Sequence, residues 1–481
     1  MTSPTVPSLL RRAAERFGEA PAIITREGTE SFTELHRAAA AAAAAYRERG
    51  VSPGDRVLLM VRNSAPAVHA WLGAIYAGAI PAAVNPELTG PEREYVVNDL
   101  EPKVTLGDAD LKMLATSGAH APPPETDASS VAAIVYTSGT TSRPKGVMVR
   151  HAAYTQAGLA FPAWIGLGRQ ERLWACLPLF HINAQAYSLM SALAHGHSLA
   201  LTDRFHASSF WQDARELQVT SVNVVGAMMA ILARQPASTW CASSLRTIYA
   251  APAPAPAERQ NLETRFRVRI TSGYGLSENP FGCVESPTSR EKAGSVGRPR
   301  QPVSGAFINE LRILRAGGIE VGIGEEGELC FRNPVMTPGY WNAPEITRAT
   351  LVDGWLHTGD LGHQDADRDV FLTGRSKDMI RRRGENIAPA EVEDALISHP
   401  AVSAVAVLGL PSDLTEEEVV AVVVLADGQH ADEAELQAWA AKSLAPYKIP
   451  SRIVFRSTMP MTPTLRVAKE LLRRELMGVE R

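Results

Sequence analysis

Residues 134–146 read Ile-Val-Tyr-Thr-Ser-Gly-Thr-Thr-Ser-Arg-Pro-Lys-Gly, an apolar run that leads into a polar loop. Small and hydroxyl residues follow the apolar strand: Thr137, Ser138, Gly139, Thr140 and Thr141. The N–H groups and hydroxyls of such a loop can converge on the oxygens of an anion, and Lys145 adds positive charge. The GxxxxGK[ST] spacing of a Walker loop is absent. The stretch predicts a phosphate-binding loop of another kind; the alternative is a Ser/Thr-rich turn.

On both sides of this loop, short β-branched runs alternate with helical stretches. We expect strands at residues 57–61, 131–136, 198–201, 221–225 and 268–271. This alternation predicts an α/β fold with largely parallel sheets flanked by helices.

From about Glu310 the sequence becomes richer in short strands, which we expect at 311–314, 327–332 and 369–372 and which indicate a small β-rich subdomain. One GxGxxG, at Gly322, Gly324 and Gly327, leads into an expected strand rather than a helix, so we interpret it as a turn.

A separate α+β unit is expected after residues 374–377, with helices at 389–398 and 432–444 and strands at 401–408 and 419–425. A chain of 481 residues exceeds what one core usually organises. We therefore divide it into domains 1–376 and 377–481, with the boundary near Lys377.

Composition is that of an ordinary globular protein, with 45% apolar and 21% charged residues. A net charge of −4 provides no strong field for nucleic acid or an anionic membrane. No Cys-x-x-Cys links the four cysteines, so they are expected to be buried free thiols in a reducing cytoplasm: Cys176, Cys241, Cys283 and Cys330.

No membrane segment is expected. Residues 1–17 lack the apolar region of a signal peptide. The alanine run at 38–45 is far shorter than the about 20 residues that cross a bilayer, and we expect it to form a surface helix.

The loop at 134–146 closely resembles the phosphate-binding signature of the superfamily of acyl-CoA synthetases, peptide-synthetase adenylation domains and luciferases. Further motifs follow in the family's order from about Phe32 to Lys469. The resemblance implies a large N-terminal domain with a β-barrel-like part, joined at Lys377 as a hinge to a small mobile domain. It also implies ATP and Mg²⁺ as cofactors and an acid as substrate.

Residues 274–278, Tyr-Gly-Leu-Ser-Glu, look like the family's aromatic-Gly-x-Thr-Glu element. By this resemblance Tyr274 stacks on adenine, Gly275 also binds the nucleotide, Ser277 contacts the α-phosphate and Glu278 holds magnesium. Magnesium held by one carboxylate and phosphate oxygens is chemically reasonable. Residues 354–362 are similar to the ribose-binding segment, where Asp360 would accept hydrogen bonds from both ribose hydroxyls. Arg375 would contact ribose or phosphate.

Two further segments resemble the walls of the family's acid pocket. Residues 178–181, Pro-Leu-Phe-His, are similar to the segment whose histidine gates this pocket. Residues 249–252 match the Gly-Ala-Pro strand end along adenine, with Ala250 in place of glycine and with Ala251 and Pro252 toward the nucleotide. The resemblance thus implies this set of pocket residues: His181, Val225, Gly226, Ala250 and Gly273.

The pattern departs from the family near the C-terminus, where a glycine-flanked lysine normally bridges the carboxylate and the α-phosphate. Here Leu465 and Arg466 occupy these two positions. Arginine keeps the charge but is bulkier and planar, so the exchange is not neutral. Three readings stay open: Arg466 does the lysine's work, the acid is unusual and matched to arginine, or adenylation is impaired. Lys469 is offset along the chain and is not expected to substitute.

We expect an enzyme that activates an acid as its adenylate with release of pyrophosphate and then transfers the acyl group to coenzyme A. Loading a separate carrier protein is the second choice. A third is activation of nitrite for coupling to an aryl amine, as some relatives do. The non-enzymatic alternative is an ATP-binding regulator that has lost turnover, against which the presence of Glu278, Asp360 and Arg375 speaks.

Overall fold

A computed structural model describes residues 4–114, 122–137, 144–251, 253–254, 256–286, 292, 294–303, 305–375, 378–382, 385–412, 416–462 and 467–478. The chain forms two compact units. The first comprises residues up to Leu311 together with Phe331–Leu356, and the second comprises Arg312–Cys330 and His357–Arg481. The division runs within three strands: β15 (Glu310–Arg315), β17 (Gly327–Arg332) and β19 (Trp355–Gln364). Lys377 lies outside the described residues, so a hinge there stays a prediction.

The helices of the first unit are α1 (Val6–Phe17), α2 (Phe32–Glu48), α3 (Ala65–Tyr76), α4 (Gly90–Leu100), α5 (His151–Ile165), the π-helix η2 (Ala184–Leu189), α6 (Met190–His195), α7 (Phe210–Glu216), α8 (Gly226–Arg234), α9 (Pro256–Phe266) and α10 (Pro344–Thr350). Its strands are β1 (Pro21–Ile24), β2 (Thr29–Ser31), β3 (Arg56–Met60), β4 (Ile80–Ala83), β5 (Val104–Gly107), β6 (Val131–Thr137), β7 (Lys145–Arg150), β8 (Arg172–Ala175), β9 (Ser198–Leu201), β10 (Ser221–Val225), β11 (Thr247–Ala251), β12 (Arg269–Tyr274), β13 (Cys283–Val284), β14 (Ser295–Pro299) and β18 (Leu351–Val352).

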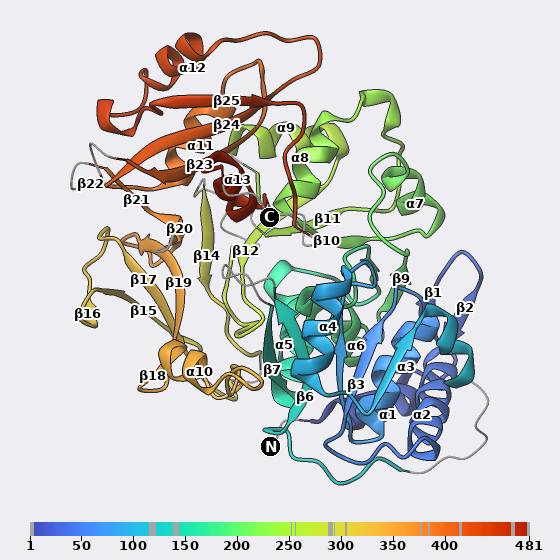
Figure 1. The fold of residues 1–481 in the computed structure, drawn as a ribbon. Helices are drawn as coiled ribbons and strands as arrows, with labels where there is room; N and C mark the ends of the chain where they lie inside the picture. The colour runs from blue at the N-terminus through green and yellow to red at the C-terminus, as the bar shows by residue number, and fades with distance from the viewer. Residues whose placement is uncertain are drawn as a thin grey trace. The chain divides into compact units, whose positions relative to one another are not determined.

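Two sheets organise this unit (Figure 1). In one, neighbouring strands β12, β11, β10, β8, β9 and β1 run parallel. In the other, β5, β3, β4 and β6 are parallel, and β7 returns antiparallel to β6. Residues of both sheets and of helices α1, α2, α3 and α5 share one hydrophobic core. The α/β architecture with mostly parallel sheets predicted from the sequence is confirmed.

The alanine-rich helix α2 is buried, so the expectation of a surface helix was wrong. Residues Ala39–Ala45 are at most 9% exposed. A Cβ placed on Gly73 of α3 would lie only 2.5 Å from the Ala42 Cβ. Small side chains on both helices allow this close packing, and the alanine run therefore serves the core rather than the solvent face.

The second unit contains strands β16 (Ile319–Glu320), β20 (Val370–Arg375), β21 (Ile380–Arg382), β22 (Glu385–Ile387), β23 (Val402–Pro411), β24 (Glu417–Leu425) and β25 (Arg452–Arg456), with helices α11 (Pro389–Ile397), α12 (Glu433–Ala440) and α13 (Lys469–Leu476). Alternate residues of β24 point to opposite faces of its sheet and belong to two different hydrophobic clusters. Val419, Ala421 and Val423 pack with α11 and α12, whereas Val420 and Val422 pack with Leu472 of α13. The sheet β23-β24-β25 is thus covered by helices on both faces (Figure 1).

The glycine-rich turn, the cysteines and the absence of a membrane segment were also predicted from the sequence. Gly322 and Gly324 lie in a turn before β17, as expected, and not at a helix start. All four cysteines are free; three are buried, but Cys241 is partly exposed. Among the described residues, no helix is both long and apolar enough to cross a membrane.

Candidate active site

Residues predicted for the acid pocket and the nucleotide lie at the carboxyl ends of three adjacent parallel strands. Val225 ends β10 and is paired with Ala251, the last residue of β11. Gly273 and Tyr274 end the neighbouring strand β12. The carboxyl edge of an open parallel sheet is where α/β proteins bind ligands, because the connecting loops diverge there. The topology thus brings these sequence-distant residues to one edge.

The predicted phosphate loop joins two antiparallel neighbours. Thr137 ends β6 and is paired with Lys145, which begins β7. Ser138, Gly139, Thr140 and Thr141 lie outside the described residues. The Lys145 ammonium lies 5.8 Å from the centre of the Tyr340 ring, within reach of a cation–π contact. The two ends of the loop are therefore held together by the sheet.

Glu278, the predicted magnesium ligand, is held by the same tyrosine. The Tyr340 hydroxyl donates a hydrogen bond to Glu278 Oε1 at 2.7 Å, and the Thr337 N–H donates to the Glu278 carbonyl at 2.8 Å. Burial and the neighbouring carboxylate raise the pKa of Tyr340, so it stays a donor. Carboxylate and phosphate oxygens suit Mg²⁺, and the Glu278 side chain fits such a site. Sequence reasoning missed Tyr340, because nothing local links it to a residue 62 positions away.

A network of buried amides fixes the segment that carries Ser277 and Glu278. Asn333 Nδ2 donates to Asn279 Oδ1 at 3.1 Å and to Asn309 Oδ1 at 2.8 Å. All three asparagines are at most 6% exposed. Asn279 Oδ1 also accepts from the Phe281 N–H at 3.1 Å, whereas Asn279 Nδ2 has no partner among the described residues. Each hydrogen bond that a buried amide does form favours one backbone path, since leaving its polar group unpaired costs about 1–3 kcal/mol. Ser277 and Glu278 thereby stand on a rigid base, both partly exposed.

Tyr274, predicted to stack on adenine, has a fixed ring orientation. Its ring is stacked against that of Phe331, with centroids 6.2 Å apart and an interplanar angle of 25°. The residue is 7% exposed. Next to it, Gly275 is exposed.

The predicted gate, His181, lies just before η2 and is partly exposed. The tilted ring of Phe180 lies 4.6 Å from the His181 ring, and the His181 N–H donates to the Pro178 carbonyl at 3.0 Å. Asn223 of β10 donates to Asn183 Oδ1 at 2.9 Å and ties this segment to the sheet. Val225 and Gly226 are partly exposed, whereas Ala250 and Gly273 are buried.

Arg300, whose side chain lies beside Gly273, is a second residue that sequence reasoning missed. A Cβ at Gly273 would lie 2.6 Å from Tyr249 Cε2 and 2.7 Å from Arg300 Nη2. Glycine is therefore required here by the close approach of these two side chains. The motif Gly-Arg-Pro-Arg (297–300) offered the only signal, and it does not distinguish Arg298 from Arg300.

In the second unit the two residues predicted to bind ribose meet directly. Arg375 Nε lies 2.8 Å from Asp360 Oδ1, and the two residues are paired across β19 and β20. Asp360 is 5% exposed, and its N–H donates to Thr358 Oγ1 at 3.0 Å. The carboxylate is thus oriented by a guanidinium and by its own turn.

Arg466 is the predicted catalytic cation near the C-terminus. Arg466 lies outside the described residues, as do Pro252 and Lys377. Met461 and Val467, on either side of Arg466, form an antiparallel bridge. The Lys469 ammonium pairs with Glu393 at 2.6 Å, so this lysine is engaged within the second unit, in line with the expectation that it does not substitute.

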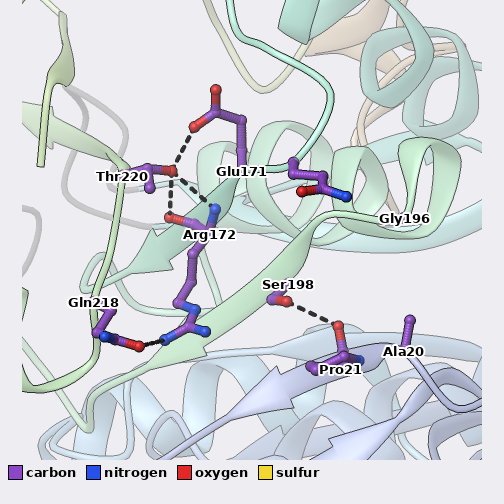
Figure 2. A pocket seen from close by; sticks show the side chains of 9 residues that line it. Ala20, Pro21, Glu171, Arg172, Gly196, Ser198, Gln218 and Thr220 are labelled. Carbon is purple, nitrogen blue, oxygen red and sulfur yellow. Dashed lines mark hydrogen bonds between the residues drawn. The ribbon is translucent and has the colours of Figure 1, made fainter. Parts of the chain in front are cut away.

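A surface pocket of about 340 Å³ lies at the opposite edge of the parallel strands (Figure 2). Arg172 and Ser198, which begin β8 and β9, belong to its lining: Ala20, Pro21, Gln170, Glu171, Arg172, Gly196, Ser198, Gln218 and Thr220. Figure 2 shows Thr220 bonded to Glu171 and Arg172. Their mutual hydrogen bonds satisfy these polar groups, and none is a predicted site residue. This pocket is distinct from the candidate active site.

Comparison with known proteins identifies the family of the chain. Residues 10–341 match the model of the AMP-binding enzymes, and residues 391–465 match that of the AMP-binding enzyme C-terminal domain. The chain is 30% identical to sulfoacetate–CoA ligase of Cupriavidus necator, over 97% of this chain and 96% of the relative. It is 32% identical to feruloyl-CoA synthase of Amycolatopsis sp, over 92% and 93%. The structure is similar to o-succinylbenzoate CoA synthetase from Bacillus subtilis in complex with the acyl-adenylate intermediate OSB-AMP, with a TM-score of 0.88 and 27% identity, over 100% of this chain and 99% of the other.

Proposed function

Since the chain belongs to the AMP-binding enzyme family, we propose a role for each candidate residue in the activation of an acid by ATP. The protein is an ATP-dependent adenylate-forming ligase of the acid–CoA ligase type, using ATP, Mg²⁺ and coenzyme A. A carboxylate oxygen of the acid attacks the α-phosphorus of ATP, and the bond to pyrophosphate breaks. The thiol of coenzyme A then loses its proton and attacks the acyl carbon, and AMP leaves.

The observation that carries the assignment is the contact series Lys145–Tyr340–Glu278. It brings a cation from the end of the predicted phosphate loop and a carboxylate to the same aromatic side chain. Polyphosphate binding needs both: positive charge and loop amides for the β- and γ-phosphates, and a carboxylate for Mg²⁺. We assign the loop from Thr137 to Lys145 to the phosphates, Glu278 to the metal and Ser277 to the α-phosphate.

For the nucleoside, we assign Tyr274 and Gly275 to adenine together with Ala251 and Pro252. We assign the ribose to Asp360, whose carboxylate is oriented by Arg375. The salt bridge supports this assignment, because a carboxylate fixed by a guanidinium presents its oxygens in one direction. His181, Val225, Gly226, Ala250 and Gly273 form the acid pocket in this proposal, with Lys377 as the hinge.

Arg466 is assigned to the acid and the α-phosphate during adenylation. Its charge stabilises the negative charge that develops on the oxygens of the transferring group. Coenzyme A is the acceptor that we propose, and the thiol of a carrier protein, which reacts in the same way, is the second candidate. We place the enzyme in the cytoplasm, which its free cysteines support.

The test is pyrophosphate release by the purified full chain with ATP, Mg²⁺, coenzyme A and single acids. Arg466→Ala is expected to lower the rate by about 10²–10³-fold, and Arg466→Lys should restore part of it. Lys469→Ala is the matched control, because that lysine is engaged with Glu393, and it should stay within about twofold. Equal activity of Arg466→Ala and wild type would remove arginine from this role. No pyrophosphate release with any carboxylic acid, but release with nitrite and an aryl amine, would contradict the acid–CoA ligase reaction and favour activation of nitrite.

A further inference from the structure

Arg300 is a buried cation with an unusual set of partners. It is 1% exposed and follows β14 directly. Its Nε donates to the Cys283 carbonyl at 3.0 Å, and Nη1 donates to the Pro280 carbonyl at 3.0 Å and to the Tyr187 hydroxyl at 2.5 Å. Nη2 donates to the Tyr249 hydroxyl. These bonds use four of the five N–H groups of a guanidinium, so one N–H of Nη2 has no partner among the residues that the structure describes.

The partners of Arg300 do not neutralise its charge. Among the described residues no carboxylate forms a salt bridge with it; its acceptors are carbonyls and phenols. Burial raises the pKa of Tyr249 to about 12 and that of Tyr187 above its ordinary value, so both phenols stay protonated at neutral pH. The rings of Trp164, Tyr187 and Tyr249 lie 5.0–5.3 Å from the guanidinium carbon and provide cation–π attraction only.

A buried charge without a counter-ion costs several kcal/mol, which an arriving anion would offset. A hydrophobic residue at position 300 would fill the same space without this desolvation cost. Charge at this depth is therefore best explained by a ligand of opposite sign.

The position of Arg300 coincides with the inner end of the predicted acid pocket. Tyr249 and Ala251 are two residues apart on β11 and face the same side of the sheet. Val225 is paired with Ala251 in the parallel register and shares that side. A Cβ on Gly273 would clash with both Tyr249 and Arg300, so these two side chains lie directly beside this glycine. The guanidinium thus stands behind residues assigned to the acid.

Two glycines leave the approach to the guanidinium free of side chains. Gly273 has no Cβ to push Tyr249 and Arg300 away. Gly275 is exposed, yet a Cβ there would lie 3.1 Å from the Tyr187 hydroxyl and 3.8 Å from Arg300 Nη1. The cation is therefore close to an exposed backbone position beside the nucleotide residues, although its own side chain is covered.

We propose that the acid carries a second anionic group, a carboxylate or a sulfonate, and that Arg300 binds this group together with Tyr249. This inference rests on the proposed function, because it concerns the substrate of the same reaction. Tyr187 and Tyr249 are large, buried side chains bonded to the guanidinium, so in this proposal they limit the length of the acid that reaches it. One end of the molecule is activated at the α-phosphate, and the other end takes up the remaining N–H of Nη2.

A purely structural role for Arg300 predicts something different. Its bonds to the carbonyls of Pro280 and Cys283 also hold the loop between β12 and β13. If this were its whole purpose, replacing it would lower stability and the activity toward every acid in the same proportion. Discrimination between charged and neutral acids separates the two roles.

The experiment compares acids of equal shape and different charge with the full chain, ATP, Mg²⁺ and coenzyme A. Malonate and succinate are paired with their monoamides, and sulfoacetate distinguishes a sulfonate from a carboxylate. We expect kcat/KM of the wild type to be at least roughly tenfold higher for the dianions, the scale of one charge-assisted hydrogen bond. Arg300→Met should abolish this ratio, Arg300→Lys should keep part of it, and the exposed neighbour Arg298→Met should leave it unchanged.

A wild type that uses the monoamides or unsubstituted acids as well as the dianions would overturn the inference while leaving the proposed function standing. The same holds if Arg300→Met retains the wild-type ratio. If Arg300→Met fails to fold, the wild-type ratio and Arg300→Lys still decide. Absence of pyrophosphate release with all acids, neutral ones included, would instead defeat the proposed function and this inference with it.

Discussion

The Tyr340 hydroxyl lies 2.7 Å from Glu278 Oε1, and the ring of the same tyrosine lies 5.8 Å from the Lys145 ammonium. One side chain therefore contacts both the predicted metal ligand and the cation of the predicted phosphate loop. A side chain in this position orients charged groups without needing to react.

Replacing this tyrosine tests that arrangement. Tyr340→Phe keeps the ring but removes the donor to a charged carboxylate, which is worth about 1.5–3 kcal/mol. We expect kcat for pyrophosphate release to fall roughly 10–100-fold, with a higher Mg²⁺ concentration needed for half-maximal rate. Tyr46→Phe removes a buried hydroxyl that donates to the Ala70 carbonyl and should leave both values unchanged. A Tyr340→Phe enzyme with the wild-type magnesium dependence would contradict the assignment of Glu278.

The Asp360–Arg375 salt bridge predicts an effect on nucleotide binding. Arg375→Gln leaves the Asp360 carboxylate without its guanidinium, so its orientation toward ribose is lost. KM for ATP should rise about tenfold or more, on the scale of a hydrogen bond to a charged group. Arg312→Gln, which breaks the more exposed pair with Glu320, serves as the control and should not change KM. An unchanged KM for ATP in Arg375→Gln would argue against the ribose assignment.

Close packing of α2 on α3 predicts a strong effect of a single methyl group. A Cβ at position 73 would meet the Ala42 Cβ at 2.5 Å and the Ala39 carbonyl at 3.0 Å. Gly73→Ala should lower the free energy of unfolding by about 1–3 kcal/mol, although alanine favours helix. Gly28→Ala, where no atom lies within 4 Å, should change it by less than about 0.5 kcal/mol. Urea unfolding measures the stability of both variants. Equal stability of Gly73→Ala and Gly28→Ala would show that α2 and α3 move apart to accommodate the methyl group.

Burial of His151 predicts a loss of stability in acid. The residue is 3% exposed, its Nδ1 accepts from the Val6 N–H at 3.3 Å, and burial lowers its pKa to about 4 from 6.5. Above pH 6.5 the ring is neutral in both states. Between pH 6.5 and 4 His151 is protonated in the unfolded chain but stays neutral in the folded chain. The free energy of unfolding therefore falls by up to about 1.4 kcal/mol for each pH unit by which the pH is lowered.

His151→Asn keeps an acceptor but cannot titrate, so its stability should depend less steeply on pH within that window. Burial and the neighbouring His195 lower the pKa of His197 as well, to about 4, so part of the slope will remain in the variant. The partly exposed His206→Asn is the control. Denaturant unfolding at pH 7.5, 6.0 and 5.0 measures the difference, and identical slopes in all three proteins would exclude His151 as a source.

Parts of this molecule could be predicted from the sequence because they depend on local order. Strands β9, β10 and β17 begin and end at the residues expected from the sequence. Site residues such as Val225 and Tyr274 are the last residues of their strands, and parallel strands bring their carboxyl ends to one edge. The α2 helix was predicted, but its burial was not, because the close fit of Ala42 against Gly73 is a property of two helices.

Arg300 shows why the rest was beyond sequence reasoning. Residues two apart in a strand face the same side, so Arg298 and Arg300 look equivalent. The strand β14 ends at Pro299, and the alternation ends with it: Arg298 is exposed and Arg300 is buried. The partners of Arg300 come from η2, β11 and the loop before β13, which no spacing rule connects.

The division between the compact units also bears on how the protein is made. The polypeptide crosses from one unit to the other after Leu311, after Cys330 and after Leu356. Domains generally fold as units while the ribosome is still at work, the N-terminal one first. Here the first unit lacks Phe331–Leu356, and with it the tyrosine that holds Glu278, until these residues leave the exit tunnel. A nascent chain released before that point carries the ends of the predicted phosphate loop without the tyrosine that binds Glu278, so we expect ATP to stabilise the folded enzyme only late in translation.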